Sequence, residues 1–354
     1  MAHDRFLLVW DRFGDYHRAR WRALQARVGQ QNVVAADLGG ADDKYKWEST
    51  DADDQYVLLS EKSVEEDDDA RRLANYTRCL DDFGITVVCV GYGRPIYRKF
   101  ARIARKRGLR VIIFSESWYP RNFLFDLLKG ISLRRLGDGF LLSGQRASRH
   151  FSGRLGVPAD RIRCGYDCVD NAHFARPAAA PPREKIVLCV ARFAPVKNLL
   201  GLIEAFLASE LAVDWHLRLV GDGPQREELE AIAARHPNIS LSQWLTYAEL
   251  PGCYHAASLL VLPSTFEPWG LVVNEGAAAG LPLIVSEETG AVTDLVTPDN
   301  GATFPATDTD RLTGIFNRYA ALDADVLQQQ GETSQRLVSR FSPEHWAAAV
   351  LELA

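Results

Sequence analysis

Two cationic side chains follow a short apolar run in the second half of this 354-residue chain. Arg192 and Lys197 lie five residues apart, after the apolar residues 186–190 and before a stretch with helical spacing that starts at about Leu199. A guanidinium is a planar fork for phosphate oxygens, an ammonium is a mobile positive charge, and the first backbone N–H groups of a helix attract anions. The combination predicts a diphosphate site, and a solvated loop is the alternative interpretation.

Two carboxylates eight residues apart occur in another segment, Pro-Ser-Thr-Phe-Glu-Pro-Trp-Gly-Leu-Val-Val-Asn-Glu, residues 263–275. Glu267 follows the apolar residues 259–262, and Glu275 is expected about two helical turns further along. Carboxylates in this arrangement can accept hydrogen bonds from different hydroxyl groups of one extended polyhydroxylated ligand. A cap that interacts with the helix dipole is the alternative role of Glu267. The backbone amides expected at the helix N-terminus belong to Trp269, Gly270 and Leu271.

Glycine-containing turns follow two more apolar runs. Gly223 lies in the turn Gly-Asp-Gly-Pro, residues 221–224, and a second turn, Ser-Glu-Glu-Thr-Gly, occupies residues 286–290. Glycine allows positive φ and lets a ligand approach the backbone closely. Such turns also connect strands to helices in any α/β protein, so alone they indicate only the fold.

These segments need strands that position them. Apolar runs alternate with helical spacing throughout the chain, which predicts parallel sheets covered by helices. The length exceeds that of most single cores, and residues 176–184 have the proline and alanine content of a linker. We therefore predict two doubly wound α/β domains, residues 1–175 and 185–335, and a final helix within residues 336–354. The predicted strands are 6–10, 33–36, 87–91, 111–114 and 140–143 in the first half and 186–190, 216–220, 239–241, 259–262 and 283–285 in the second.

In combination, Arg192 with Lys197, the Gly-Asp-Gly-Pro turn and the segment from Glu267 to Glu275 resemble retaining glycosyltransferase family 4, over about residues 184–300. The resemblance implies a GT-B fold, in which two Rossmann-like domains face each other across a cleft and the C-terminal helix crosses back to the N-terminal domain. By this resemblance, Arg192 and Lys197 bind the donor diphosphate and act in catalysis. Glu267, the third predicted catalytic residue, binds the transferred sugar, and Glu275 binds the ribose.

The resemblance also implies nucleotide and acceptor contacts. The nucleobase is expected beside Trp244 and Leu245, and Gly14 matches a glycine loop beside the diphosphate. Many members carry a histidine near the end of the strand equivalent to residues 111–114, where this chain has Ser-Glu-Ser-Trp. This departure makes Glu116 a candidate contact in place of that histidine. The predicted acceptor contacts are Tyr16, His17, Glu116 and Trp118.

The predicted activity is transfer of a hexosyl unit from a nucleoside diphosphate sugar, uridine-based, to an acceptor hydroxyl with retention of anomeric configuration. Cations and helix amides stabilise the departing diphosphate, and the sequence shows no cluster of metal ligands, so we expect neither a metal nor a cofactor beyond the sugar nucleotide. A nucleophilic role of Glu267 and a front-face route both remain open. The alternative functions are a sugar-nucleotide epimerase, a phosphorylase on the same scaffold, and a non-catalytic protein that binds sugar nucleotides.

Charge divides the first half of the chain, although the net charge of the whole is only −5. Residues 37–82 carry 15 acidic and 6 basic side chains, whereas residues 94–163 carry 17 basic and 4 acidic ones. We expect the two blocks to have different partners. The basic block predicts attraction of an anionic acceptor or contact with an anionic membrane. Nucleic acid is not expected, because no recognition motif accompanies these charges.

The N-terminal apolar run, residues 6–10, is too short for a signal peptide or a membrane span. We therefore expect a cytoplasmic protein, with peripheral contact at the inner membrane face through the basic block. The six scattered cysteines are expected to stay reduced. The expected acceptor is a small molecule, a glycan or a lipid-linked molecule.

Overall fold

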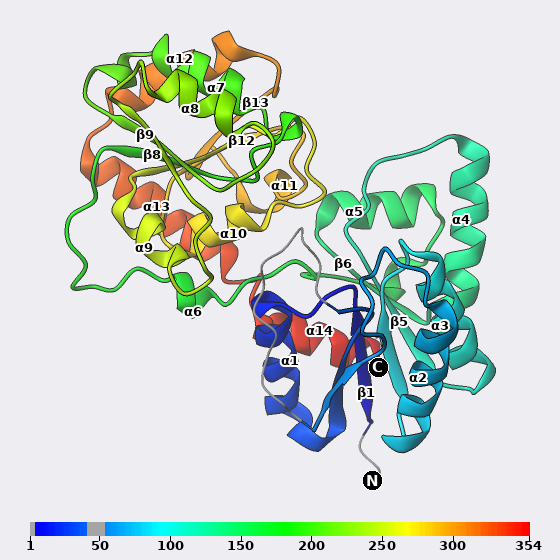
Figure 1. Cartoon of the computed structure of the whole chain (residues 1–354). Coiled ribbons are helices and arrows are strands. Elements are labelled where there is room, and N and C mark those ends of the chain that lie inside the picture. Colours follow the sequence, from blue (N-terminus) through cyan, green and yellow to red (C-terminus); the bar gives the residue numbers. More distant parts are fainter. Residues whose placement is uncertain (1–3, 41–53) are drawn as a thin grey trace. The chain divides into compact units, whose positions relative to one another are not determined.

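The computed structural model describes residues 4–40 and 54–354, which form two compact units (Figure 1). The first unit comprises Met1–Cys168 and Phe341–Ala354, and the second comprises Val169–Arg340. Each unit is built on one sheet, and the described strands pair in parallel throughout. The predicted fold of two Rossmann-like α/β domains is therefore confirmed.

The sheet of the first unit has seven strands in the order β3-β2-β1-β4-β5-β6-β7. The order reverses between β1 and β4, and the crevice at such a switch point is where ligands bind in doubly wound folds. The strands are β1 (Phe6–Trp10), β2 (Val33–Asp37), β3 (Tyr56–Leu58), β4 (Val87–Val90), β5 (Arg110–Ser115), β6 (Gly139–Leu142) and β7 (Ile162–Cys164). The α-helices are α1 (Asp15–Val28), α2 (Asp69–Asp82), α3 (Pro95–Lys106), α4 (Phe123–Leu136), α5 (Gln145–Arg149) and α14 (Pro343–Leu353).

The sheet of the second unit has six strands in the order β10-β9-β8-β11-β12-β13, with its switch point between β8 and β11. The strands are β8 (Ile186–Val190), β9 (His216–Val220), β10 (Ile239–Ser242), β11 (Leu259–Leu262), β12 (Leu283–Ser286) and β13 (Gly301–Phe304). The α-helices are α6 (Asn171–Phe174), α7 (Leu199–Leu207), α8 (Arg226–Ala233), α9 (Leu250–Ala256), α10 (Leu271–Ala278), α11 (Val292–Leu295), α12 (Thr309–Ala320) and α13 (Ala324–Val338).

Three strands were not predicted, β3, β7 and β13, and each lies at an edge of its sheet. No residue of β3 is fully buried, and the two central residues of β13 are half-buried. An edge strand has only one neighbour and needs fewer apolar side chains, so its apolar run is weak. The central strands β1, β4 and β11 are buried along their whole length, so each has a continuous apolar run that predicts a strand.

Residues 169–175, which were expected in the first domain, belong to the second unit in the structure. Phe174 is buried there, and its ring meets those of Tyr247 and Tyr254 edge-on, with centroids 5.7 and 5.8 Å apart. His173 stacks on Tyr247 at 4.1 Å. These aromatic contacts tie the segment to the second unit, ahead of the proline-rich stretch that suggested the boundary.

The chain returns to the first unit at Phe341, and α14 packs against α1. Ser342 is the N-cap of α14, and its Oγ accepts a hydrogen bond from the backbone N–H of His345 at 3.4 Å. Trp346 is fully buried, with its ring centroid 5.8 Å from that of Phe114. The final helix thus belongs to the core of the N-terminal unit, as the GT-B resemblance implied.

The acidic and basic blocks partly pair with each other in the part of the chain that the structure describes; residues 41–53 of the acidic block lie outside it. Helices α2 and α3 pack together and bring the two blocks into contact. Three ion pairs join them, Arg94–Glu65 at 3.1 Å, Lys99–Asp69 at 2.7 Å and Arg107–Asp81 at 2.6 Å. The blocks are thus partly each other's counterions.

Candidate functional site

The loop with the predicted cations and the loop with Glu267 meet at the switch point of the second unit. The loop with Arg192 and Lys197 follows β8, and the loop with Glu267 follows β11. These strands are neighbours and run parallel, so their carboxyl ends lie at the same edge of the sheet. Sheet order therefore unites side chains that are 70 residues apart.

An ion pair between Lys197 Nζ and Glu267 Oε2 connects the two loops. The side chains are 21% and 17% exposed, so the pair is only partly accessible to solvent. A backbone hydrogen bond from Thr265 N–H to the carbonyl of Val196, 2.8 Å, joins the same loops. The Ser264 hydroxyl also donates to Glu267 Oε2 at 3.3 Å. The carboxylate is therefore held in one position by a cation and a hydroxyl.

The backbone of Glu267 is fixed as well. Its N–H donates to the carbonyl of Glu288 at 3.1 Å, and its carbonyl accepts from the N–H of Gly290 at 3.0 Å. The predicted glycine turn after β12 thus supports the loop after β11. Backbone hydrogen bonds from the turn after β12 therefore fix the position from which the Glu267 side chain projects.

Arg192 differs from Lys197 in its surroundings. Its side chain is exposed and forms no hydrogen bond or ion pair with any residue that the structure describes. The loop that carries it is bound to the turn after β9, since Phe193 N–H donates to the carbonyl of Asp222 at 2.8 Å. A fixed loop with an unpaired guanidinium is ready to accept an anion.

The glycines of the turn after β9 are explained by this loop. Gly221 and Gly223 have φ of +148° and +154°, which other residues rarely adopt. A Cβ at Gly221 would lie 1.9 Å from the Ala191 carbonyl oxygen, and one at Gly223 would lie 2.5 Å from that of Phe193. The N–H of Gly223 donates to Asp222 Oδ1 at 2.8 Å. The close approach that requires glycine here is therefore that of the Arg192 loop.

Residues 269–275 form the start of α10 and part of the core. Gly270 is the N-cap in the left-handed region, φ +98°, and the helix begins at Leu271, so of the three predicted amides only that of Leu271 belongs to the first turn. Trp269 is 2% exposed, and its Nε1 donates to Asn274 Oδ1 at 2.8 Å. Its indole is a core group. Glu275 is also buried, in the second turn of this short helix.

The carboxylate of Glu275 accepts a hydrogen bond from the Tyr254 hydroxyl at 2.5 Å. Tyr254 lies on α9 and is fully buried. The sequence held no signal for this contact, because α9 packs near α10 only in the folded unit. The predicted base contacts, Trp244 and Leu245, follow β10 at the same edge of the sheet, with Trp244 45% exposed.

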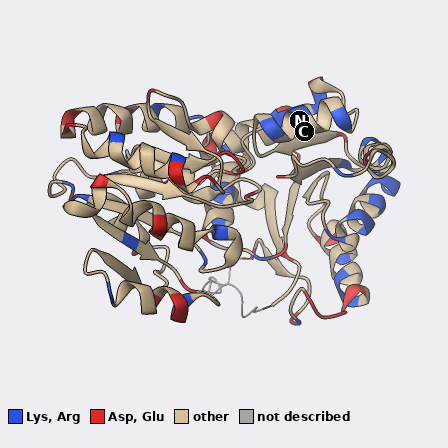
Figure 2. Cartoon of the chain, turned by 90° about the horizontal axis from the view of Figure 1, so that it is seen from above, with Lys and Arg blue, Asp and Glu red and all other residues tan. Residues whose placement is uncertain are grey.

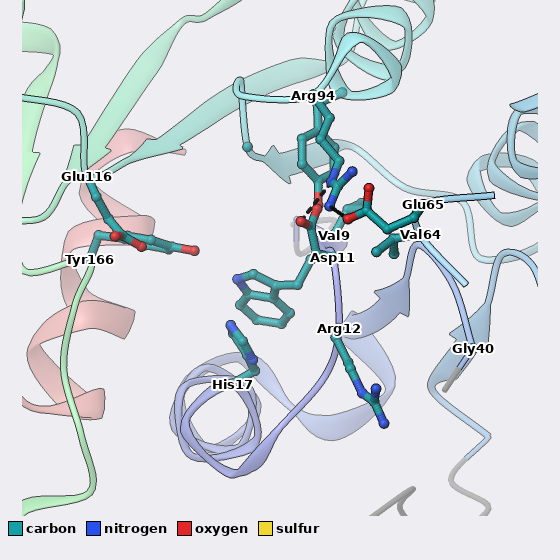
Figure 3. Close-up of a pocket in the computed structure, with 13 residues that line it drawn as sticks. Val9, Asp11, Arg12, His17, Gly40, Val64, Glu65, Arg94, Glu116 and Tyr166 are labelled. Carbon is teal, nitrogen blue, oxygen red and sulfur yellow. Dashed lines mark hydrogen bonds and ion pairs between the residues drawn. The ribbon is translucent and has the colours of Figure 1, made fainter. Parts of the chain in front are cut away.

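The first unit contains a cavity of about 510 Å³ at its own switch point (Figure 3). Asp11 and Arg12 come from the loop after β1, and Arg94 and Tyr97 come from the segment after β4. Glu116 and Tyr166 follow β5 and β7 and lie across the cavity from Arg94. The sequence pattern pointed to the loop after β1 but missed four of these side chains, Asp11, Arg94, Tyr97 and Tyr166.

A polar network occupies one wall of this cavity. Arg94 Nε donates to Asp11 Oδ2 at 2.8 Å, and its NH2 group donates to Glu65 Oε1 at 3.1 Å. The Tyr97 hydroxyl donates to Asp11 Oδ1. Burial and the adjacent Asp11 carboxylate raise the pKa of Tyr97 well above its usual value, so the phenol keeps its proton. Asp11 thus accepts from two fixed donors.

Two of the four predicted acceptor contacts line the cavity, His17 and Glu116. Burial and the nearby Arg20 lower the pKa of His17 well below its usual value, so the imidazole is neutral at pH 7. Its Nδ1 accepts a hydrogen bond from the N–H of Gly14 at 3.2 Å, which occupies the predicted glycine's amide at the start of α1. His17 therefore contributes an uncharged side chain to the lining of the cavity.

The other two predicted acceptor contacts, Tyr16 and Trp118, lie outside the lining of the cavity. Tyr16 is half-buried on α1. Trp118 packs against the hydrophobic core, and the Arg146 guanidinium lies 4.9 Å from the centre of its ring. The structure therefore separates the four residues into two pairs.

Among residues 4–40 and 54–354, no three His, Cys, Asp or Glu side chains are grouped so that they could hold a metal ion. In the same part of the chain, no helix combines the length and the apolar character that crossing a membrane requires. All six cysteines are free thiols, and Cys164 is exposed while the other five are buried.

Residues 171–336 match the family model described as "Glycosyl transferases group 1". The lipopolysaccharide core biosynthesis glycosyltransferase LpsD of Rhizobium meliloti is 34% identical over 132 residues, which is 34% of this chain and 37% of that protein. A GDP-mannose-dependent alpha-(1-6)-phosphatidylinositol monomannoside mannosyltransferase of Mycolicibacterium smegmatis is 24% identical over 303 residues, 74% of this chain and 78% of that protein. The chain covers only 34 to 38% of the length of several curated relatives.

Solved structures resemble the whole chain in fold. Sucrose-phosphate synthase from Thermosynechococcus elongatus has a TM-score of 0.77 at 18% identity, over 99% of this chain and 98% of its own. Anabaena Alr3699/HepE in complex with UDP and glucose has a TM-score of 0.74 at 15% identity, over 99% of both chains. At these identities the likeness concerns the fold, which is that of GT-B glycosyltransferases.

Proposed function

We propose, from the premise that residues 171–336 form a glycosyltransferase group 1 domain in a chain with the GT-B fold, that this protein is a retaining hexosyltransferase. It transfers a hexosyl unit from a nucleoside diphosphate sugar, uridine-based, to an acceptor hydroxyl. One observation carries the proposal. The ion pair of Lys197 and Glu267 joins both loops at the switch point of the second sheet, and Arg192 is exposed on one of them.

Arg192 and Lys197 bind the donor diphosphate. As the bond between the sugar and the diphosphate breaks, the diphosphate gains negative charge, and fixed cations in a partly desolvated site stabilise that charge. Lys197 is held by Glu267, so it needs little reorganisation before the reaction. The unpaired guanidinium of Arg192 supplies two parallel donors to phosphate oxygens. These cations perform the role that a divalent ion has in other transferases.

Glu267 and Glu275 bind hydroxyl groups of the donor. Glu267 lies beside Lys197 and therefore next to the diphosphate, which suits the hydroxyls of the transferred sugar. Glu275 is buried against Tyr254, further along α10, and binds the ribose. Trp244 is 45% exposed after β10 and offers an aromatic surface to the base. The fold neighbour HepE holds UDP and glucose, which supports the choice of a uridine donor.

The proposed reaction follows a front-face route. The bond between the anomeric carbon and the diphosphate oxygen breaks, and its electron pair leaves with the diphosphate. The acceptor oxygen bonds to the anomeric carbon on the same face, and its proton passes to an oxygen of the departing diphosphate. Glu267 shares its charge with the Lys197 ammonium, which weakens it as a nucleophile and favours this route over a covalent intermediate.

The acceptor binds in the cavity of the first unit. Trp10, Tyr97 and Tyr166 supply aromatic surface, and Glu116 supplies an acceptor for hydroxyl protons. His17 is neutral and so adds no charge of its own. This mixture of aromatic and hydrogen-bonding groups suits a hydroxylated small molecule, a glycan or the sugar of a lipid-linked acceptor.

The test is an assay of the full chain with a panel of nucleoside diphosphate sugars, with and without sugar acceptors. We expect nucleoside diphosphate release that depends on the acceptor, and a product whose anomeric proton coupling equals that of the donor. Conversion of the donor to an epimer would instead identify an epimerase. Binding of nucleotides without any turnover would identify a non-catalytic protein. An inverted product would refute the stereochemistry proposed.

A further inference from the structure

Exposed apolar side chains are concentrated at the start of α4. Six of the twelve large apolar side chains that are exposed in the described residues lie within residues 119–128. Phe123 is 72% exposed, Leu124 64% and Leu128 59%. Isolated exposed apolar residues are normal, but a contiguous group indicates a binding surface. We call this group the apolar patch, and it consists of Tyr119, Phe123, Leu124, Phe125, Leu127 and Leu128.

The helix under the apolar patch is held by polar contacts. Asn122 is the N-cap and accepts from Phe125 N–H at 2.8 Å. Asp126 is buried within this run, and its carboxylate accepts from Arg154 Nε at 2.7 Å and from the N–H of Arg121. The apolar side chains are therefore not needed to anchor α4, and a rigid helix presents them outward.

The segment of the apolar patch also carries positive charge, with Arg121 and Arg135 exposed and Lys129 and Arg134 half-buried. Residues 119–136 contain Arg121, Lys129, Arg134 and Arg135, and their single acidic residue, Asp126, is already paired. Arg135 is exposed and has no ion pair among the described residues. Figure 2 shows Lys and Arg positions frequent on the helices of the first unit, at the right of the view. An apolar surface with exposed cations on the same segment complements an anionic bilayer, whereas two copies of this face repel each other.

We propose that the apolar patch docks the protein on an anionic membrane, with the aromatic and leucine side chains inserted among the lipids and the cations at the headgroups. The helix α4 has 14 residues, about 21 Å at 1.5 Å per residue, which is shorter than the apolar core of a bilayer. It therefore lies in the interface and does not span. This proposal adds an insertion to the electrostatic contact expected of the basic block, and it does not depend on the proposed glycosyl transfer.

The experiment is co-sedimentation of the full chain with vesicles of phosphatidylglycerol and phosphatidylcholine, and with phosphatidylcholine alone, at low and high salt. We expect binding to the anionic vesicles that weakens with salt. The double variant Phe123→Ser with Leu124→Ser should lower the partition coefficient about tenfold or more, because two apolar side chains no longer enter the lipid. The matched control is Val213→Ser, at an isolated apolar residue of the second unit that is 86% exposed, and it should bind like the parent.

Two further measurements keep the test decisive. Thermal unfolding should be similar in all three proteins, because the changed side chains are exposed and make few contacts. Sedimentation velocity without lipid should show the same mass for parent and double variant. The proposal is overturned if the parent does not bind anionic vesicles at low salt, or if the double variant binds as well as the parent. It is also overturned if the parent dimerises without lipid and the double variant does not, since the apolar patch would then bind a second copy.

Discussion

Replacing Lys197 with alanine should weaken nucleoside diphosphate binding more than replacing Arg192 does, although Arg192 is the more exposed cation. Lys197→Ala removes one phosphate contact and also leaves the Glu267 carboxylate without its cation, next to the incoming diphosphate. Arg192→Ala removes a phosphate contact alone, because the guanidinium has no partner among the described residues. The two variants therefore differ by the repulsion from Glu267.

The expected magnitudes follow from burial. Losing an exposed charge-assisted contact costs about 1.5 kcal/mol, roughly tenfold in Kd. Truncating one partner of a buried ion pair costs about 2–5 kcal/mol, and the lower part of that range applies because these side chains are 21% and 17% exposed. Lys197→Ala should therefore lose about 3 kcal/mol of binding, roughly 150-fold. Adding Glu267→Gln should recover about half of that free energy, since the anion is neutralised.

The assay is isothermal titration calorimetry, with the nucleoside diphosphate that gives the largest thermal shift in a panel. The matched control is Lys185→Ala, since Lys185 also forms an ion pair in the second unit, with Asp214, but its side chain is 61% exposed. Affinity should stay within twofold of the parent in this control. Equal losses in Lys197→Ala and Arg192→Ala, or no recovery on adding Glu267→Gln, would refute the role of this ion pair.

Three other outcomes are expected. Gly221→Ala should lower the free energy of unfolding by about 3 kcal/mol or more, because this residue has a positive φ and lies against the Ala191 carbonyl. The control Gly252→Ala, at a helical position of α9 with open space around it, should raise the free energy of unfolding by up to about 1 kcal/mol. Urea denaturation measures both values. Burial raises the pKa of Asp37 from 3.8 to about 7, so the stabilising contribution of this carboxyl is complete below about pH 4 and is lost as the pH rises toward 7. The free energy of unfolding should fall by at most about 1.4 kcal/mol per pH unit in this range. Asp37→Asn should flatten this dependence in urea titrations between these pH values, and an unchanged slope would contradict the prediction. Glu116→Gln should lower the acceptor-dependent rate about tenfold and leave nucleotide affinity within twofold, and a parallel loss of both would argue against its place in an acceptor site.

The sequence alone was sufficient to predict the central strands, the final helix and the loops that carry the candidate site residues. Central strands such as β1 and β11 are apolar on both faces because helices cover both sides of a parallel sheet. Each of these strands can therefore be recognised in the sequence from its own apolar run. The start of α14 follows from Ser342 at the N-cap and from the proline after it. The loops that carry Arg192 and Glu267 were also recognisable, since polar side chains directly follow apolar strands.

Contacts between segments that are distant in the chain could not be predicted from the sequence pattern. Lys197 meets Glu267 because β8 and β11 are neighbours in the sheet, and strand order is a property of the whole unit. The hydrogen bond from Tyr254 to Glu275 and the pairing of the acidic with the basic block have the same origin. Side-chain periodicity records which face of an element is buried, but not which other element covers it, and that choice is made by the packing of the complete fold.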